Sequence, residues 1–255
     1  MGNAFYQTFK RHHVLESLLK AGISMPDHIR QIHVPQATRR RANFATLTTK
    51  DKTIIGFHER KSSNIVDVPD CLLISEDVRR VMDGLRPYLP VIAGQGAKMD
   101  VLIQCADGVC EIGLTGKVAP GWEAQQALSD ALRTLGLARI SLRARDYESY
   151  KILLSEKAFI KAFDSLLVEL APCAFLQPSF EGERALVNCV MEGAGDASCI
   201  ADLFCGNGTF AGALMGGREV AAFDSAEDSI HALQKAGVAA HARNLFKNPL
   251  PADEL

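Results

Sequence analysis

The stretch ADLFCGNGTF, residues 201–210, decides how the second half of the sequence folds. A short apolar run ends against Gly206 and Gly208, two glycines one residue apart. A short helical segment follows at 209–215, then a second strand in EVAAFD (219–224), a helix at 226–237 and a third strand from residue 238. This β-α-β-α-β order predicts the start of a doubly wound parallel sheet.

The glycine loop is one residue short of the dinucleotide pattern. G-x-G-x-x-G would need a third glycine at position 211, but this chain has Ala211 and then Gly212, which disfavours a nicotinamide cofactor. Asp202, just before the loop, favours a cationic ligand over a diphosphate, because a carboxylate repels a pyrophosphate. S-adenosyl-L-methionine is such a cation, and Asp224 at the end of the second strand is placed to accept hydrogen bonds from its ribose hydroxyls. The alternative is an ordinary strand-to-helix turn that binds nothing.

The first two thirds of the chain predict a different arrangement. Residues 3–21 have helical spacing of apolar side chains and Gly22 as a stop. Residues 39–70 read as two or three strands, 75–89 as a helix capped by Ser75, and 98–116 as a hairpin around Asp107-Gly108. A helix at 122–135 leads into a strand that carries arginines, ARISLRAR (138–145). We therefore expect an α+β domain before the doubly wound one.

Composition limits the class of protein. The chain has 255 residues, 47% of them hydrophobic, with a formal net charge of -2. Its apolar runs are too short for a membrane span, and the N-terminus lacks an apolar stretch before a cleavage site, so we expect a cytoplasmic protein with no membrane partner. The seven cysteines are an odd number without a CxxC pair, which predicts reduced thiols rather than a disulfide framework.

Two local groups of arginines are candidates for binding nucleic acid, since the net charge itself favours no polyanionic partner. The first is Arg39, Arg40 and Arg41. The second is Arg139, Arg143 and Arg145, which strand alternation would place on one face. A solvated sheet face without a partner is the alternative for both groups.

Several segments together resemble a known family across almost the whole chain. They are RRRANF (39–44), GFHERKSSNIVDVPDC (56–71), AFLQPS (174–179), ADLFCGNGTF (201–210) and AAFD (221–224). The sequence resembles the RNA uracil-5-methyltransferases that use a cysteine nucleophile, and in particular the 23S rRNA members, which carry an iron-sulfur cluster. The resemblance implies S-adenosyl-L-methionine as cofactor and RNA as substrate, with ribosomal RNA favoured over tRNA.

The resemblance also implies roles for single residues. Phe175 and Gln177 of AFLQ would contact the cofactor, Gly206 and Gly208 would line its methionine part, and Asp224 would bind its ribose. Asn244 stands where the family often has an aspartate after the third strand, and Ser179 stands where an asparagine usually follows the glutamine. Cys71 matches the last of four cluster-ligating cysteines, but its three partners do not occur before it, so no cluster is expected here.

The catalytic segments of the family are not found. Its nucleophile lies in S-C-N-P, and a D-P-P-R loop handles the base, and neither occurs here. Ser198-Cys199 is the nearest match, but inside the predicted first strand its thiol should be buried and inert. We therefore expect no catalytic residue in this chain, and interpret it as a fragment truncated at both ends that is inactive alone.

The sequence predicts three parts: a helix at 1–30 that packs on the methyltransferase domain, an α+β RNA-binding domain at 31–173, and an incomplete class I methyltransferase domain at 174–255. An uncovered edge on the strand at 199–204 would allow self-association. The main hypothesis is methylation of uridine C5 in RNA. The alternatives are a non-catalytic RNA-binding module and, less favoured by the arginines, a methyltransferase for small molecules.

Overall fold

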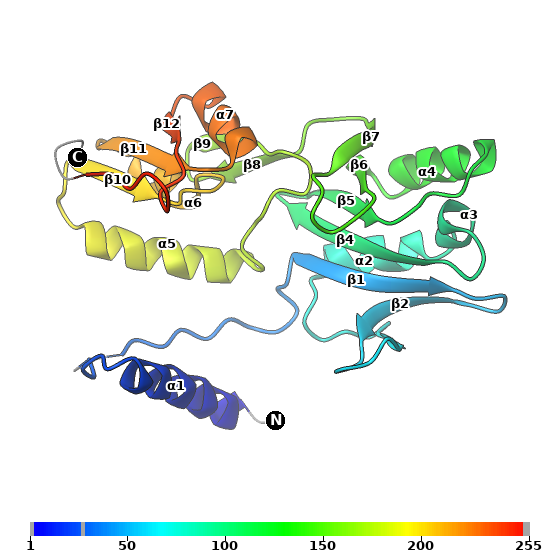
Figure 1. Cartoon of the computed structure of the whole chain (residues 1–255), viewed down its shortest axis with the longest axis horizontal. Coiled ribbons are helices and arrows are strands. Elements are labelled where there is room, and N and C mark those ends of the chain that lie inside the picture. The colour runs from blue at the N-terminus through cyan, green and yellow to red at the C-terminus, as the bar shows by residue number, and fades with distance from the viewer. Residues whose placement is uncertain (1–2, 27–28, 252–255) are drawn as a thin grey trace. The chain divides into compact units, whose positions relative to one another are not determined.

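The computed structural model describes residues 3–26 and 29–251 (Figure 1). Residues 1, 2, 27, 28 and 252–255, which fall in the predicted first and third parts, lie outside the described residues. The chain separates into two compact units, residues 1–35 and residues 36–255. The first unit contains helix α1 (Asn3–Lys20), and Gly22, the predicted stop, follows its end with φ +71°. Among the described residues, no helix is long and apolar enough to cross a bilayer.

The second unit begins with a seven-stranded sheet. Its strands lie in the order β3-β2-β1-β4-β5-β6-β7. Their bounds are β1 (Arg41–Thr48), β2 (Thr53–His58), β3 (Ile65–Asp67), β4 (Lys98–Ala106), β5 (Val109–Thr115), β6 (Leu137–Arg143) and β7 (Lys151–Ser155). All neighbours are antiparallel except β5 and β6. The predicted hairpin at Asp107-Gly108 is confirmed, with φ of +51° and +78° at the two turn residues.

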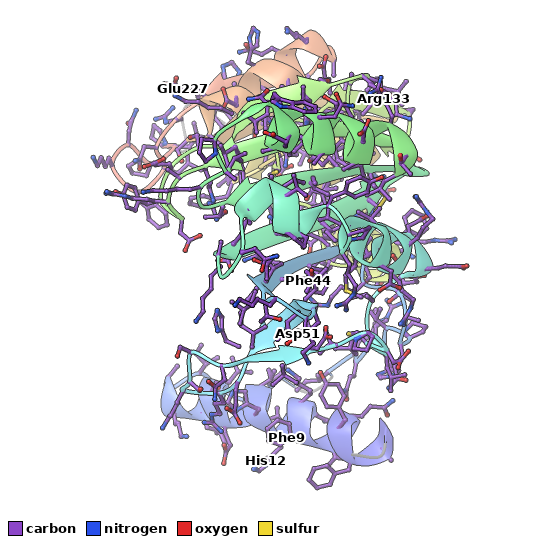
Figure 2. The ribbon with its side chains drawn as sticks, turned by 90° about the vertical axis from the view of Figure 1, so that its right-hand side faces the viewer. Phe9, His12, Phe44, Asp51, Arg133 and Glu227 are labelled. Atoms are coloured by element: carbon purple, nitrogen blue, oxygen red, sulfur yellow. A yellow bond between two sulfur atoms is a disulfide. The ribbon has the colours of Figure 1, made fainter. Side chains whose placement is uncertain are left out.

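Three helices pack on one face of this sheet: α2 (Glu76–Leu85), α3 (Leu89–Ala93) and α4 (Trp122–Thr134). Ser75 caps α2 as predicted, because its side chain accepts a hydrogen bond from Val78 N. The single helix predicted at 75–89 is instead two, because Pro87 has no backbone N–H to continue the ladder beyond Leu85. Phe44 on β1, labelled in Figure 2, is fully buried in this first core.

Strand β5 divides its side chains between the two faces of the sheet. Cys110, Ile112 and Leu114 belong to the core under the helices. Glu111 and Gly113 alternate with them and therefore point to the opposite face. There, a Cβ on Gly113 would lie 2.4 Å from Cys173 Sγ, so the chain after β9 lies directly against the sheet.

A hairpin and a small parallel sheet complete the second unit. Strands β8 (Ile160–Phe163) and β9 (Leu166–Glu169) form the hairpin, and helix α5 (Phe180–Ala194) follows. The parallel strands are β10 (Cys199–Leu203), β11 (Glu219–Asp224) and β12 (Ala239–Ala242), connected by α6 (Thr209–Leu214) and α7 (Glu227–Lys235). The predicted β-α-β-α-β order is thus confirmed, and with it the α/β fold class that places a Rossmann-like half after an α+β domain.

Candidate cofactor site

The glycine loop joins the end of β10 to the start of α6. Three of its residues have positive φ: Phe204 at +61°, Gly206 at +54° and Gly208 at +87°. A Cβ on Gly208 would lie 2.4 Å from Leu233 Cδ2, whereas a Cβ on Gly206 would meet nothing within 4 Å. Gly208 is therefore needed for packing against α7, while Gly206 keeps open space in front of the loop.

Gly212, the glycine one position late for a dinucleotide loop, has a packing role. A Cβ there would lie 2.6 Å from the backbone oxygen of Phe163. The absence of a side chain lets α6 approach strand β8 directly, as the third glycine of a Rossmann fold lets its helix approach a strand. The extra residue in the spacing therefore changes what the glycine packs against.

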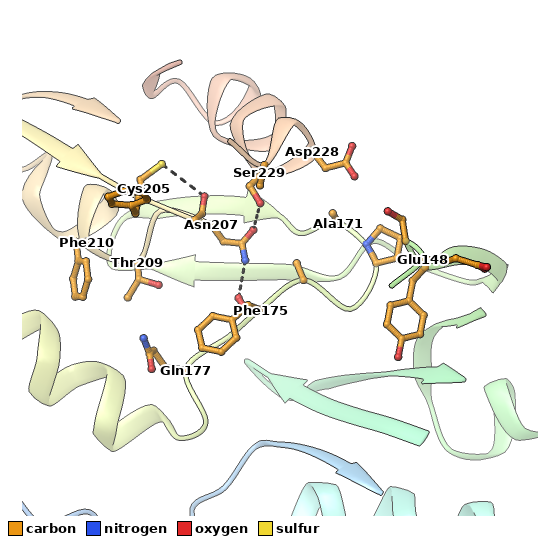
Figure 3. Close-up of a pocket in the computed structure, with 17 residues that line it drawn as sticks. Glu148, Ala171, Phe175, Gln177, Cys205, Asn207, Thr209, Phe210, Asp228 and Ser229 are labelled. Carbon is orange, nitrogen blue, oxygen red and sulfur yellow. Dashed lines mark hydrogen bonds between the residues drawn. The ribbon is translucent and has the colours of Figure 1, made fainter. Parts of the chain in front are cut away.

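A cavity of about 440 Å³ lies beside the loop (Figure 3). Its volume falls in the range typical of small-molecule sites. Its lining comes from four segments: the loop after β6, the connector between β9 and α5, the glycine loop, and the start of α7. The lining residues are Glu148, Ser149, Tyr150, Ala171, Pro172, Ala174, Phe175, Gln177, Phe204, Cys205, Gly206, Asn207, Thr209, Phe210, Ala226, Asp228 and Ser229.

The charges around this cavity favour a cation. Among the described residues that line it, Glu148 and Asp228 are acidic and none is lysine or arginine. Within the lining itself, a diphosphate would meet two carboxylates and no lysine or arginine, whereas a sulfonium or ammonium group would be attracted to the carboxylates. The lining thus supports a cationic ligand, as Asp202 suggested, but through Glu148 and Asp228.

Asn207 holds the cavity together, although the sequence patterns do not single it out. Its Nδ2 donates to the backbone oxygen of Phe175 at 2.6 Å, and its Oδ1 accepts from Ser229 Oγ at 2.8 Å (Figure 3). The side chain is buried. One amide therefore connects the glycine loop to both the connector and α7. In the sequence, only the position of Asn207 between the two glycines could have indicated this role.

The predicted cofactor residues fall into two groups. Phe175, Gln177 and Gly206 line the cavity, and Gly208 supports the loop beneath it. Asp202, Asp224 and Asn244 are absent from the lining. Asn244 instead closes the turn after β12, where its Oδ1 accepts from Lys247 N at 3.2 Å.

The two aspartates act on the backbone of the loop. Asp224 Oδ2 accepts from Gly206 N and its Oδ1 from Ala226 N, each at 2.9 Å. Asp202 Oδ2 accepts from Ala211 N at 3.0 Å. Burial raises the pKa of Asp202 to about 6, the negative charge of Asp224 adds to the increase, and the Ala211 hydrogen bond opposes it. Both carboxylates thus fix the position of the loop.

The thiols near the loop differ from expectation in one respect. Cys199, predicted to be buried, is exposed at the first residue of β10, because a strand's first residue is less covered than its centre. It lies at the opposite end of β10 from the glycine loop. Cys205 lines the cavity, and burial raises the pKa of its thiol to about 12, so the thiol is protonated at neutral pH.

Two of the six candidate RNA-binding arginines, Arg40 and Arg139, are buried in ion pairs. Arg40 Nη2 lies 2.6 Å from Glu183 Oε2, and both side chains are less than a tenth exposed. Arg139 is 3% exposed and its Nε donates to Glu111 Oε2. Alternation could not show this for Arg139, because the sheet face that it occupies is covered by the connector rather than by water.

The other four arginines are accessible to different degrees. Arg39 and Arg145 are exposed, and Arg41 and Arg143 are half-buried. Arg145 lies beyond the end of β6, so it does not share a strand face with Arg139 as predicted. The guanidinium groups of Arg41 and Arg143 lie over the rings of Phe175 and Tyr150, at 5.4 and 4.4 Å from the ring centres.

Two cysteines of the seven-stranded sheet differ from the prediction of reduced thiols. Cys105 and Cys110 lie opposite each other on β4 and β5 and form a disulfide. The pairing places their Cα atoms 4.0 Å apart, a distance that sequence spacing alone does not reveal. Cys71 is half-buried beside the first core. Within the described residues, no group of three histidine, cysteine or acidic side chains is arranged to hold a metal.

Curated relatives and a solved structure match most of the chain. No family model matches the sequence. It is 28% identical over 98% of its length to an uncharacterized RNA methyltransferase of Zymomonas mobilis, and 26% identical over 99% to one of Rhizobium meliloti. Over 77% of its length it is 26% identical to the 23S rRNA (uracil(1939)-C(5))-methyltransferase RlmD of Dichelobacter nodosus. The chain spans 64% and 61% of the first two relatives.

A solved structure has the same fold. The tRNA (uracil-54, C5)-methyltransferase of Pyrococcus abyssi, in complex with S-adenosyl-L-homocysteine, superposes with a TM-score of 0.70 at 20% sequence identity. The match covers 94% of this chain and 62% of that one. The predicted Rossmann-like α/β fold is therefore confirmed, and the sequence relatives carry the name of RNA methyltransferases.

Proposed function

We propose that this chain binds S-adenosyl-L-methionine in the cavity beside the glycine loop. The observation that carries the proposal is a cavity of cofactor size whose charged lining residues are Glu148 and Asp228. The fold supports it, because the solved neighbour with this fold is a complex with S-adenosyl-L-homocysteine. When bound, the cofactor would supply an activated methyl group.

The residues around the cavity fit the parts of such a ligand. Glu148 and Asp228 would attract its cationic groups, and the exposed ring of Phe175 offers an apolar surface. Gly206 provides room beside the loop because nothing lies within 4 Å of where its Cβ would be. Asp202 and Asp224 would keep the loop in place without lining the cavity, and Asn207, which lines it, would hold the loop to the connector. We propose no direct ribose contact for Asp224, since it is not among the residues that line the cavity.

We further propose that the chain takes part in methylating uridine C5 in RNA, in the cytoplasm, with ribosomal RNA preferred to tRNA. The names of the sequence relatives support this reaction, and the one with a stated RNA acts on 23S rRNA. In this proposal residues 31–173 contact RNA, and residues 174–255 bind the cofactor together with Glu148 and its neighbours in the loop after β6. Cys205 would pack beneath the cofactor rather than attack uracil, because a thiol whose pKa is raised to about 12 is a poor source of thiolate at neutral pH.

Titration calorimetry with S-adenosyl-L-homocysteine tests the cofactor site. The 255-residue chain should bind it, and Asp228→Asn should weaken S-adenosyl-L-methionine more than the uncharged-sulfur homocysteine analogue, because the carboxylate acts on positive charge. Glu123→Gln, an exposed first-turn acid on α4, is the matched control. Equal weakening of both ligands by Asp228→Asn would place the carboxylate near the ammonium that both ligands carry. Unchanged affinity for both ligands would contradict the electrostatic role, and no binding by the wild type would contradict the site.

We also propose that the edge of β10 supports self-association. Among the described strands, β10 pairs only with β11, and Leu203 at its end is 46% exposed. Apolar edges of this kind favour pairing between chains. Light scattering should show a dimer or larger species that Leu203→Lys reduces. A monomer at all concentrations, with the amides of 199–203 protected from exchange, would contradict the proposal.

A further inference from the structure

A row of polar side chains crosses four strands on the sheet face that carries no helix of the first core. Its members are Arg41 on β1, Gln104 on β4, Glu111 on β5 and Arg139 on β6. Arg41 lies directly opposite Gln104, and Gln104 directly opposite Glu111, in the strand register. We call these four residues the polar row.

Hydrogen bonds run through the polar row without interruption. Arg41 Nε donates to Gln104 Oε1 at 3.0 Å, and Gln104 Nε2 donates to Glu111 Oε1 at 2.5 Å. Arg139 Nε donates to the other oxygen of Glu111. Gln104 and Glu111 are completely buried and Arg139 is 3% exposed. Because unpaired buried charges are costly, each member fixes the position of the next.

The polar row also holds the connector, residues 171–179, which carries Phe175 and Gln177 to the cavity. Arg139 Nη2 donates to the backbone oxygen of Ala171 at 2.8 Å. Glu111 Oε1 accepts from Cys173 N at 3.2 Å. At the other end of the row, the guanidinium of Arg41 lies over the ring of Phe175. The contacts thus follow the connector from its start to the cavity.

Arg40, next to the row, holds the end of the connector. Its Nε donates to Gln177 O at 3.1 Å, and its backbone N donates to Pro178 O at 2.7 Å. Its Nη2 pairs with Glu183 at the start of α5. From the opposite side, Asn207 of the glycine loop donates to Phe175 O. The connector is therefore fixed by two buried ion pairs from one side and by the loop from the other.

We infer that the polar row and Arg40 are positioning residues, which set the geometry of the cofactor cavity from the seven-stranded sheet. The inference rests on the proposed function, since it assigns a purpose to the connector's placement. None of these side chains lines the cavity, so each would act through Phe175 and Gln177. Removing the charge of Glu111 would leave Arg139 buried without a counterion and release Cys173 N.

The test uses a single-tryptophan reporter in the full chain. Trp122 is the only tryptophan, so Trp122→Phe with Phe175→Trp places one fluorophore on the connector. In this background, Glu111→Gln is compared with Leu114→Ala. Leu114 lies on the same strand and is fully buried in the core on the opposite face, so its truncation lowers stability without touching the connector.

We expect Glu111→Gln to lower the fluorescence anisotropy of the connector fluorophore and to speed exchange of the Cys173 amide, and Leu114→Ala to change neither at temperatures well below melting. The dissociation constant for S-adenosyl-L-homocysteine should rise about tenfold in Glu111→Gln, or ~1.4 kcal/mol, and stay within about twofold in Leu114→Ala. Equal anisotropy and exchange in the two variants would overturn the inference. If the wild-type chain, with its native Phe175, binds no cofactor, the proposed function fails, and anisotropy and exchange in the reporter protein still decide the positioning role.

Discussion

The carboxylate of Asp224 and the backbone N–H of Gly206 are joined by a 2.9 Å hydrogen bond, although 18 residues separate them. The second oxygen of Asp224 accepts from Ala226 N at the start of α7. One side chain at the end of β11 therefore fixes both the glycine loop and the entrance to the following helix. Its contribution to ligand binding should pass through the loop backbone.

Replacing Asp224 by alanine should weaken S-adenosyl-L-homocysteine binding by about 1.5–3 kcal/mol, the range for hydrogen bonds to a charged group. The loop N–H would lose its acceptor and Gly206 would sample other conformations. Titration calorimetry measures the change. Asp196→Ala, an exposed acid before β10, is the control and should leave affinity unchanged. Wild-type affinity in Asp224→Ala would show that the loop keeps its shape without this acceptor.

Gly212→Ala should lower the free energy of unfolding by about 1–3 kcal/mol, as overpacking does. The new Cβ would lie 2.6 Å from Phe163 O, which belongs to the backbone of β8 and cannot rotate away. Gly216→Ala is the matched control, because nothing lies within 4 Å of its Cβ position and its φ is not in the left-handed region. Denaturant unfolding of both variants checks the prediction, and an equal effect would disprove the close approach of α6 to β8.

The pKa of Asp202, raised to about 6 by burial, predicts a pH dependence of stability. The folded state binds this proton more tightly than the unfolded state, whose aspartate titrates near a pKa of about 3.9. The stabilisation of the folded state by this protonated carboxyl is therefore fully present below about pH 4 and is lost as pH rises through about 6. Asp202→Asn should remove a destabilisation on the order of 2 kcal/mol near pH 7. In melting curves, the stability of the wild type relative to Asp202→Asn should be lower at about pH 7.5 than at about pH 4.5. Parallel curves for the two proteins would contradict the assignment.

Sequence patterns predicted the backbone better than the environment of charged side chains. The apolar run of EVAAFD, the Asp107-Gly108 turn and the Ser75 cap are local signals, and each specifies a backbone geometry that the structure confirms. Arg40 and Arg139 are different, since their partners Glu183 and Glu111 lie 143 and 28 residues away. Strand alternation indicates which face a residue takes, but not whether a distant connector covers that face.

The same limit applies to the cavity. Gly206 was found from its spacing, and Phe175 and Gln177 from the family resemblance. Glu148, Asn207 and Asp228 have no distinctive pattern, because they come together only when the loop after β6 and the start of α7 meet the glycine loop. Their charges nevertheless decide which ligand the cavity favours.

The Cys105–Cys110 disulfide predicts the number of reactive thiols. Of the seven cysteines, five are free in the structure. Alkylation in denaturant without reductant should therefore modify five, and alkylation after reduction all seven, as mass spectrometry can count. Cys105→Ser should raise the unreduced count by one, because it frees Cys110, and should lower the count after reduction by one. Modification of all the cysteines before reduction would mean that the pair is reduced in the purified protein.

The exposed arginines predict how RNA affinity depends on salt. Arg39 and Arg145 are exposed and can reach a phosphate backbone, whereas Arg40 and Arg139 are held by buried carboxylates. Each lost phosphate contact should reduce the slope of log affinity against log salt by about 0.7 on single-stranded RNA. Arg39→Gln with Arg145→Gln should thus reduce it by roughly 1.4 in filter-binding assays across a salt series. Arg133→Gln on the outer surface of α4, labelled in Figure 2, is the control for general charge and should leave the slope unchanged. A double variant with the wild-type slope would mean that these two arginines are solvated surface residues, and that any RNA contact lies elsewhere on the chain.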